Sequence, residues 1–188
     1  NLQGDLIINP LPAAITVKVL ANDKCFNEPV PVAVSGLGNL TAATLSYMLS
    51  DSNSSTLQTV VLNVVNGNAD FFIPVNLLAN TGTTVISASN LMNNTTLCDV
   101  SLNNVSDGFF VNPIPSAPTV NNLQTFCKVD GATITNLTPR GSQYKWYVSQ
   151  TAATPLADTY VLKTENLYVR ETSSANCTSA PTAVSIVV

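Results

Sequence analysis

The chain contains no histidine and few charged residues. Asp, Glu, Lys and Arg make up 10% of its 188 residues, against roughly 25% in an average domain. Without histidine, the common Ser–His and Cys–His nucleophile arrangements are excluded. Paired carboxylates for glycoside hydrolysis would have to come from 11 acidic residues, nearly all in expected turns and loops. We therefore expect no enzymatic activity.

Basic residues and long apolar runs are also scarce. Seven Lys and Arg residues, scattered and outnumbered by acids, give a net charge of −4, which cannot form the basic face that nucleic-acid binding requires. No apolar run approaches the roughly 18 residues of a membrane span, so we expect no direct membrane insertion. No signal peptide is recognisable and residue 1 is Asn, so we expect a mature or excised segment.

The four cysteines do not have the spacing of a metal or redox motif. No Cys-x-x-Cys occurs, which argues against zinc and against a thioredoxin-type site. Cys25 and Cys98 fall in the first half, and Cys127 and Cys177 in the second. Three pairings are possible; we favour the one within each half, Cys25–Cys98 and Cys127–Cys177. Two structural disulfides predict an oxidising, extracytoplasmic location.

A short phrase occurs twice in the chain. Residues 8–12 read Ile-Asn-Pro-Leu-Pro and residues 111–115 read Val-Asn-Pro-Ile-Pro, a shift of 113 − 10 = 103 between the first prolines. Cys25 and Cys127 show almost the same shift, 127 − 25 = 102. Two markers that move together predict tandem modules, with boundaries at 1–114 and 115–188. We expect the chain to be a slice of a longer repeat protein, with another Asn-Pro after Val188.

Apolar residues alternate with polar ones over short segments, which predicts an all-β fold. Expected strands include residues 15–19, 29–34, 45–49, 59–65 and 70–75 in the first module, and 132–135, 143–148, 160–162, 167–170 and 183–187 in the second. Asn66-Gly67-Asn68 predicts a tight hairpin turn, because Asn and Gly tolerate positive φ. Many short strands separated by turns indicate two β-sandwiches. The short proline-containing linker at 112–118 is expected to be extended and semi-rigid.

The order of these elements resembles a known family. Cys127, Tyr144-Lys145-Trp146-Tyr147, Leu167-Tyr168-Val169, Cys177 and a closing Val-Ser-Ile-Val-Val resemble the Ig-like repeats of giant secreted Bacteroidota proteins, including the flavobacterial gliding-motility adhesin. The first module resembles a longer relative through Val65 to Pro74 and Asn80-Thr81-Gly82. The resemblance implies tandem Ig-like modules, type IX secretion, display on the cell surface (associated with the outer membrane through the parent protein) and adhesion. It departs from antibody domains around Cys177, so we expect disulfides that pin a loop to a strand start near the module ends.

Few residues are candidates for ligand contacts. Trp146 is expected in the core, whereas Tyr147 and Lys145 point to the opposite face of the strand and are candidate glycan contacts. The run Asp51-Ser52-Asn53-Ser54, and Asn104 with Asp107, carry oxygens that calcium accepts, but Asn, Asp and Ser are also ordinary turn residues. We therefore expect no metal and no cofactor, with calcium as the alternative.

Three functions compete. The first is a stalk or adhesive repeat of a large adhesin in surface attachment and gliding, a monomeric fragment whose partners are surface polysaccharide or abiotic surfaces and neighbouring modules. The second is a carbohydrate-binding module of a secreted polysaccharide-degrading enzyme, which a row of exposed aromatics would favour. The third is an animal Ig-like or fibronectin-like receptor fragment, for which the several Asn-x-Ser/Thr sequons would carry glycan.

Overall fold

The protein is described by a computed structural model, which places residues 15–20 and 23–188. It is all-β, with three one-turn 3-10 helices and no α-helix among the described residues. The chain divides into two compact units, Asn1–Asn112 and Pro113–Val188, so the division falls two residues before the expected boundary. Each unit has a hydrophobic core of its own.

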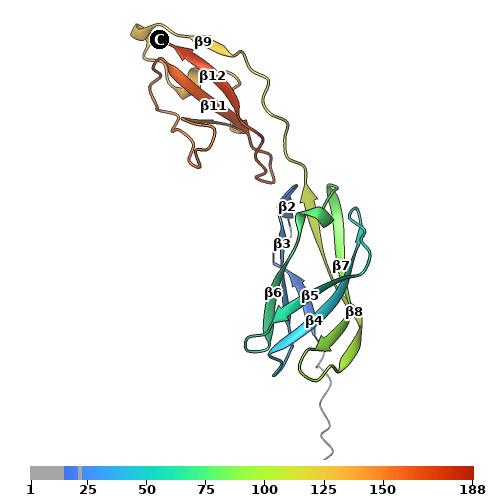
Figure 1. The fold of residues 1–188 in the computed structure, drawn as a ribbon. Helices are drawn as coiled ribbons and strands as arrows, with labels where there is room; N and C mark the ends of the chain where they lie inside the picture. Colours follow the sequence, from blue (N-terminus) through green and yellow to red (C-terminus); the bar gives the residue numbers. More distant parts are fainter. Residues whose placement is uncertain (1–14, 21–22) are drawn as a thin grey trace, which may run out of the picture. The chain divides into compact units, whose positions relative to one another are not determined.

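The first module is a sandwich of two sheets (Figure 1). One sheet has the order β1-β3-β6 and the other the order β2-β8-β7-β4-β5. The strands are β1 (Thr16–Val19), β2 (Asp23–Cys25), β3 (Val30–Ser35), β4 (Ala42–Asp51), β5 (Gln58–Asn63), β6 (Asn68–Ile73), β7 (Gly82–Asn93) and β8 (Asp99–Asn112), with the 3-10 helix η1 (Val75–Leu77) between β6 and β7.

Alternation along the strands places the core between the two sheets. In β3 the side chains of Val30, Val32 and Val34 are completely buried, whereas the residues between them are only half-buried. Successive residues of a strand point to opposite faces, so one apolar face per strand is enough to build this core. Leu45 in β4 and Ile86 in β7 close it from the other sheet.

The expected hairpin turn at residues 66–68 is present. Asn66 and Gly67 have φ values of 51° and 75°, and Val65 and Asn68 exchange backbone hydrogen bonds of 2.8 and 3.0 Å. Two central residues with positive φ match the type of turn that joins twisted antiparallel strands. Here the turn carries the chain from β5 in one sheet to β6 in the other.

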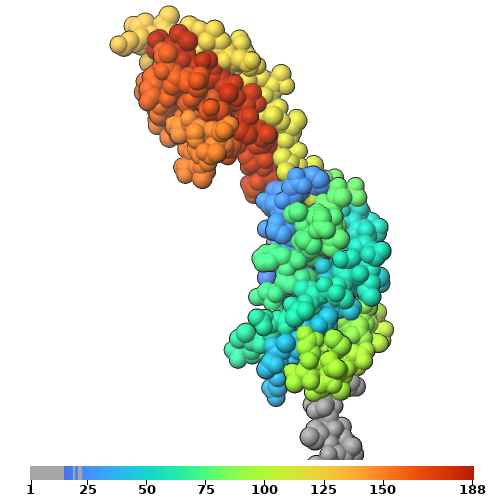
Figure 2. All heavy atoms as spheres, in the orientation of Figure 1, coloured from blue at the N-terminus to red at the C-terminus, as the bar shows by residue number. Residues whose placement is uncertain are grey.

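The second module has one regular sheet, of order β10-β11-β12-β9. Its opposing layer consists of short irregular segments that bury Ala132, Ile134, Leu137 and Leu162 against the sheet. The elements are β9 (Leu123–Thr125), η2 (Lys128–Asp130), η3 (Ile134–Asn136), β10 (Tyr144–Tyr147), β11 (Glu165–Glu171) and β12 (Thr182–Val187). Figure 2 shows the atoms of this module, from yellow to red, as a filled body.

The prediction of a strand at residues 132–135 was wrong. Ile134–Asn136 form a 3-10 helix because Thr133 and Asn136 make a reciprocal capping box around its first turn. Only a single bridge, Thr133 to Val161, remains of the expected strand pairing. Side chains that cap a turn compete with strand pairing for the same backbone groups, and at this position the cap prevails.

The repeated cysteine markers lie near each other in the frames of the two modules, but two positions apart. Cys25 is the last residue of β2, which pairs in parallel with β8, whereas Cys127 lies two residues after the end of β9, which pairs in parallel with β12. The amide of Phe26 donates to Asn112, as the amide of Phe126 donates to Val187. A tight turn then begins at Cys25 or Cys127. The first copy of the Asn-Pro phrase, residues 8–12, lies outside the described residues.

The expected disulfide within the first module is wrong. Cys25 pairs with Asn112 at one end of β8, whereas Cys98 directly precedes Asp99 at its other end. The strand between them covers 112 − 99 = 13 residue steps, roughly 43 Å at 3.3 Å per residue. A disulfide requires Cα atoms about 4.4–6.8 Å apart, so this strand holds the two cysteines far beyond bonding distance.

The expected Cys127–Cys177 pair fails for the same reason. Cys127 lies just past the carboxyl end of β12, since Phe126 bonds to Val187, and Cys177 lies in the hairpin loop before the strand begins. Five residue steps along β12, roughly 17 Å, separate these ends. Cys98 and Cys127 are free thiols, whereas Cys25 and Cys177 are both disulfide-bonded.

Candidate functional site

The second module contains a hollow of about 350 Å³ beside β10. Its floor is apolar: Ile134, Leu137 and Trp146 are all less than 8% exposed, and half-buried Tyr144 lies next to them. Charged side chains from three segments line the rest. They are Arg140 from the loop after η3, Lys145 from β10 and Asp158 from the loop before β11.

The wall that carries Arg140 is fixed by a buried glutamine. Gln124 of β9 is 8% exposed, and its amide nitrogen donates to the Thr138 carbonyl at 2.6 Å. Its amide oxygen accepts from the Thr138 backbone amide at 3.0 Å. Both polar ends of one side chain therefore hold the backbone two residues before Arg140, with a cis peptide between Thr138 and Pro139.

A glycine turn connects this wall to β10. Gly141 has a φ of 131°, in a region that residues with a Cβ rarely adopt. Its carbonyl accepts from the Tyr144 amide at 3.1 Å. A Cβ at Gly141 would press against the side-chain amide of Gln143. The turn therefore sets Arg140 and Lys145 on the rim of one hollow, five positions apart in the sequence.

The loop that carries Asp158 is tied to the same strand. The Leu156 amide donates to the Trp146 carbonyl at 2.7 Å, and the Tyr160 amide donates to Ala157 at 2.9 Å. The loop is also bonded to η3, because the Ile134 amide donates to the Tyr160 carbonyl. Asp158 is thus positioned by the backbone, as Arg140 is.

The three charged side chains of the hollow are exposed and have no ionic partner. Among the described residues the one ion pair joins Lys163 and Glu165, so Arg140, Lys145 and Asp158 remain without a counter-charge within 4 Å. Two cations and one carboxylate give the hollow a net charge of +1, in a chain of net charge −4. The hollow can therefore attract an anion and also accept hydrogen bonds.

Of the two candidate glycan contacts predicted on β10, Lys145 lines the hollow and Tyr147 does not. Lys145 is exposed and lines it, and Trp146, 3% exposed, belongs to the core as predicted. Tyr147 was expected at the surface but is only 6% exposed. Lys145 is paired with Arg170 in the sheet, so Arg170 is the diagonal neighbour of Tyr147 on that face. Its guanidinium lies 4.4 Å from the Tyr147 ring centroid and covers the ring.

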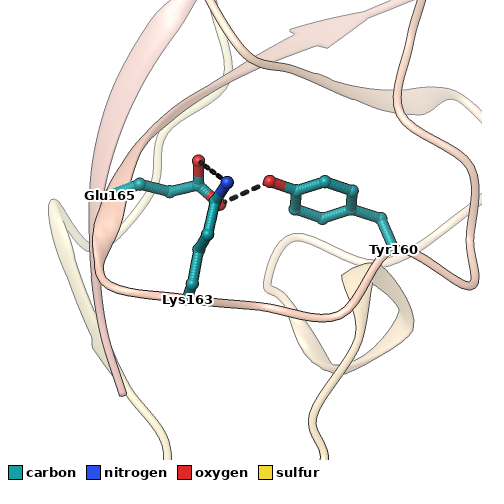
Figure 3. Close-up of polar contacts among 3 residues, drawn as sticks. All are labelled: Tyr160, Lys163 and Glu165. Atoms are coloured by element: carbon teal, nitrogen blue, oxygen red, sulfur yellow. Dashed lines mark hydrogen bonds and ion pairs between the residues drawn. The ribbon is translucent and has the colours of Figure 1, made fainter.

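A second polar cluster follows the Asp158 loop (Figure 3). The Tyr160 hydroxyl donates to Glu165 Oε1 at 2.8 Å, and Lys163 Nζ lies 3.8 Å from Glu165 Oε2. The Tyr160 hydroxyl and then the Glu165 carboxylate raise the pKa of Lys163 above its usual 10.5. The three groups satisfy one another, and Glu165 opens β11. We interpret this cluster as structural: its contacts hold the end of the loop against the first residue of β11.

In the run at residues 51–54, which was considered as an alternative calcium site, the side-chain amide of Asn53 is used in packing. Asn53 is only 3% exposed; its oxygen accepts from the Asn80 amide at 2.8 Å. Its nitrogen donates to Asn80 O and Thr84 Oγ1. Asn53 therefore faces inward, away from a cation in solvent. No cluster of three acidic, His or Cys residues that could hold a metal occurs among the described residues.

Arg140 and Asp158 were not recognised as site residues from the sequence. They are separated by 18 positions and by β10, and a three-residue 3-10 helix brings their loops together. Gly141 directly after Arg140 was the available signal, because a glycine there marks a sharp turn beside a charged residue. It does not indicate which distant loop the turn meets.

Comparison with known families places the second module. Residues 115–188 match the family described as "Ig-like domain CHU_C associated", a Bacteroidota-type Ig-like module. No curated protein sequence matches the chain. The family indicates a module of an extracellular surface protein, and Ig-like domains of this type are typically non-catalytic. Within the described part of the chain, no helix has the length and apolarity to cross a membrane.

Proposed function

Starting from the Ig-like module at residues 115–188, we propose that this chain is a repeat segment of a large cell-surface adhesin. It acts as a stalk and adhesive module in surface attachment and gliding motility. Its partners are surface polysaccharide or abiotic surfaces, together with neighbouring modules of the same chain. The parent protein is exported by type IX secretion and associates with the outer membrane, and the segment needs no cofactor and performs no catalysis.

The observation that supports this proposal is the presence of two separately packed β-modules joined by a proline-containing segment. Each module has its own core, and residues 113–122 between the last strand of the first and the first strand of the second have no regular secondary structure. Pro113 and Pro115 restrict the backbone of that segment. Such an arrangement suits a protein that displays many weak binding units along one chain and gains strength through multivalency.

The alternative role, an accessory module of a polysaccharide-degrading enzyme, would be favoured by a row of exposed aromatic rings. β10 does not supply one, since Trp146 and Tyr147 are both buried. We therefore retain the adhesin as the proposed function.

Adhesion can be tested with beads that carry the intact chain at high and low density. We expect retention under flow on polysaccharide-coated or glass surfaces to rise more steeply than bead density, because multivalent contacts multiply. Beads that carry an unrelated β-sandwich of similar charge serve as the control. Retention no better than that control on every surface would contradict the proposal.

A further inference from the structure

We propose that the hollow formed by Arg140, Lys145, Asp158, Tyr144 and Trp146 binds a carboxylate-bearing sugar unit of an acidic polysaccharide. This deepens the proposed adhesive function and rests on it, since it names the chemical class of the ligand. Its volume, about 350 Å³, lies within the range of small-molecule sites, roughly 300–1,000 Å³. It is large enough for a sugar ring and too small for a folded partner.

The charges of the hollow select an anion. Arg140 and Lys145 line one hollow from separate segments, the loop after η3 and β10, and neither has a carboxylate partner among the described residues. A guanidinium binds a carboxylate with two parallel hydrogen bonds and an ammonium adds a point charge. Since only seven basic residues occur in 188, two around one hollow form a local exception to an acidic chain.

Asp158 restricts which anion can bind. A ligand with negative charge alone, such as an acidic peptide side chain, meets repulsion from this carboxylate. A uronic acid has both a carboxylate for the two cations and hydroxyl groups that can donate to Asp158. Charge-assisted hydrogen bonds of that kind are the stronger ones, so the combination of two cations and one acid fits a hydroxylated anion better than a simple one.

The floor of the hollow provides an apolar surface for the sugar ring. Half-buried Tyr144 keeps ring surface that a sugar can contact, whereas Trp146 and Leu137, which also line the hollow, are buried in the core. A few polar groups around an apolar floor is the usual composition of a small-ligand site. Because the backbone of both loops is hydrogen-bonded to neighbouring elements, the backbone that carries Arg140 and Asp158 is fixed before a ligand arrives, which lowers the entropic cost of binding.

The chain carries its own reporter for this test. Trp146 is its single tryptophan, and it lines the hollow. Titrating the intact chain with oligogalacturonate should therefore change the tryptophan fluorescence in a saturable way. Neutral gluco-oligosaccharides and polyglutamate of matched charge are the comparison ligands, and both should bind at least about tenfold more weakly.

Single variants separate a specific site from general attraction. Arg140→Ala and Lys145→Ala should each weaken oligogalacturonate binding about tenfold, the value expected for the loss of a charged hydrogen bond. Lys128→Ala removes the same charge from an exposed lysine of the same module and should leave binding within twofold. Asp158→Ala makes the module more positive, yet should weaken binding at least about threefold through the loss of its hydrogen bonds.

Three results would overturn the inference: no saturable signal with oligogalacturonate, an equal loss in Lys128→Ala and Lys145→Ala, or tighter binding in Asp158→Ala. Equal binding of polyglutamate would assign the hollow to acidic peptides instead. If Arg140→Ala fails to fold, Lys145→Ala on the exposed face of β10 decides alone. If beads that carry Lys145→Ala still adhere, the ligand site is contradicted and the adhesive function stands. If wild-type beads never adhere although the soluble sugar binds, the adhesive function is contradicted and the ligand site stands.

Discussion

Asn53 shows how much of the first module depends on one polar side chain. Its amide makes three hydrogen bonds, of 2.8–2.9 Å, to Asn80 and Thr84, and Thr84 is itself completely buried. Asn53→Ala leaves these groups without partners, which costs about 2–4 kcal/mol of unfolding free energy. Urea denaturation would measure this, with Asn63→Ala on the exposed face of β5 as a control expected within about 0.5 kcal/mol of wild type. Equal losses in the two variants would contradict this account.

Burial of Tyr47 makes the stability of the first module depend on pH in the alkaline range. Burial raises its pKa above the ordinary 10.0, so the folded state holds the proton more tightly than the unfolded state does. The resulting stability is fully present below about pH 10 and is lost as the pH rises through the folded pKa. We expect the urea midpoint of this module, followed by methyl signals of Leu45 and Leu49 in β4, to fall less between about pH 8 and about pH 11 in Tyr47→Phe than in wild type. Tyr168→Phe, in the second module, is the control, and a fall as steep in Tyr47→Phe as in wild type would refute the assignment.

At this scale the sequence predicts burial better than exposure. Trp146 could be assigned to the core because an aromatic residue in an alternating strand usually packs inward. Tyr147 was expected to be exposed, and its burial was not predictable because it depends on Arg170 across the sheet. Which side chain covers a ring follows from strand register, and register joins residues that alternation within one strand does not relate.

The hairpin turn at Asn66-Gly67 depends on close backbone contact. A Cβ at Gly67 would lie 3.2 Å from the Gly38 carbonyl oxygen and 3.3 Å from its nitrogen, and φ there is already 75°. Gly67→Ala therefore adds a backbone clash to the cost of positive φ, which is itself about 1–2 kcal/mol. Gly38→Ala, with φ 56° and open space around its Cβ, measures the φ cost alone. We expect the larger loss of thermal stability in Gly67→Ala; equal losses would show that the contact is unimportant.

The length of β8 keeps Cys25 and Cys98 too far apart to form a disulfide. With Cys25 and Cys98 at opposite ends of β8, oxidised native protein should contain two free thiols, at Cys98 and Cys127. Alkylation followed by mass spectrometry should label exposed Cys127 faster than half-buried Cys98. Denaturing the protein without reductant should leave the count at two. A count of zero or four would contradict the structure.

Elements with clear alternation were predictable, and short ones were not. β3, β4, β11 and β12 overlap the strands expected from alternating runs in the sequence, at residues 29–34, 45–49, 167–170 and 183–187. The three-residue strands β2 and β9 are too short to show a period, yet they fix where Cys25 and Cys127 lie. The disulfide pairing could not be predicted from the sequence, because the distances between the cysteines are set by long-range strand pairing.

Charge is distributed unevenly over the whole chain. The first 112 residues hold two Lys and seven Asp or Glu, a net charge of 2 − 7 = −5, whereas the remaining 76 hold five Lys or Arg and four acids, a net charge of 5 − 4 = +1. The sequence shows this asymmetry, and it also showed the tandem organisation through the repeated phrase. The hollow needed the structure, because it is assembled from two loops and a strand.

We predict that an acidic sugar binds to the second module, and only at the hollow lined by Arg140 and Lys145. The direct test is an amide chemical-shift map of the intact chain titrated with oligogalacturonate. We expect saturable shifts grouped at residues 134–146 and 156–160, and none beyond noise in β1 to β8. Shifts spread over both modules, or centred on the first, would contradict the claim that the hollow around Arg140 and Lys145 is the ligand site.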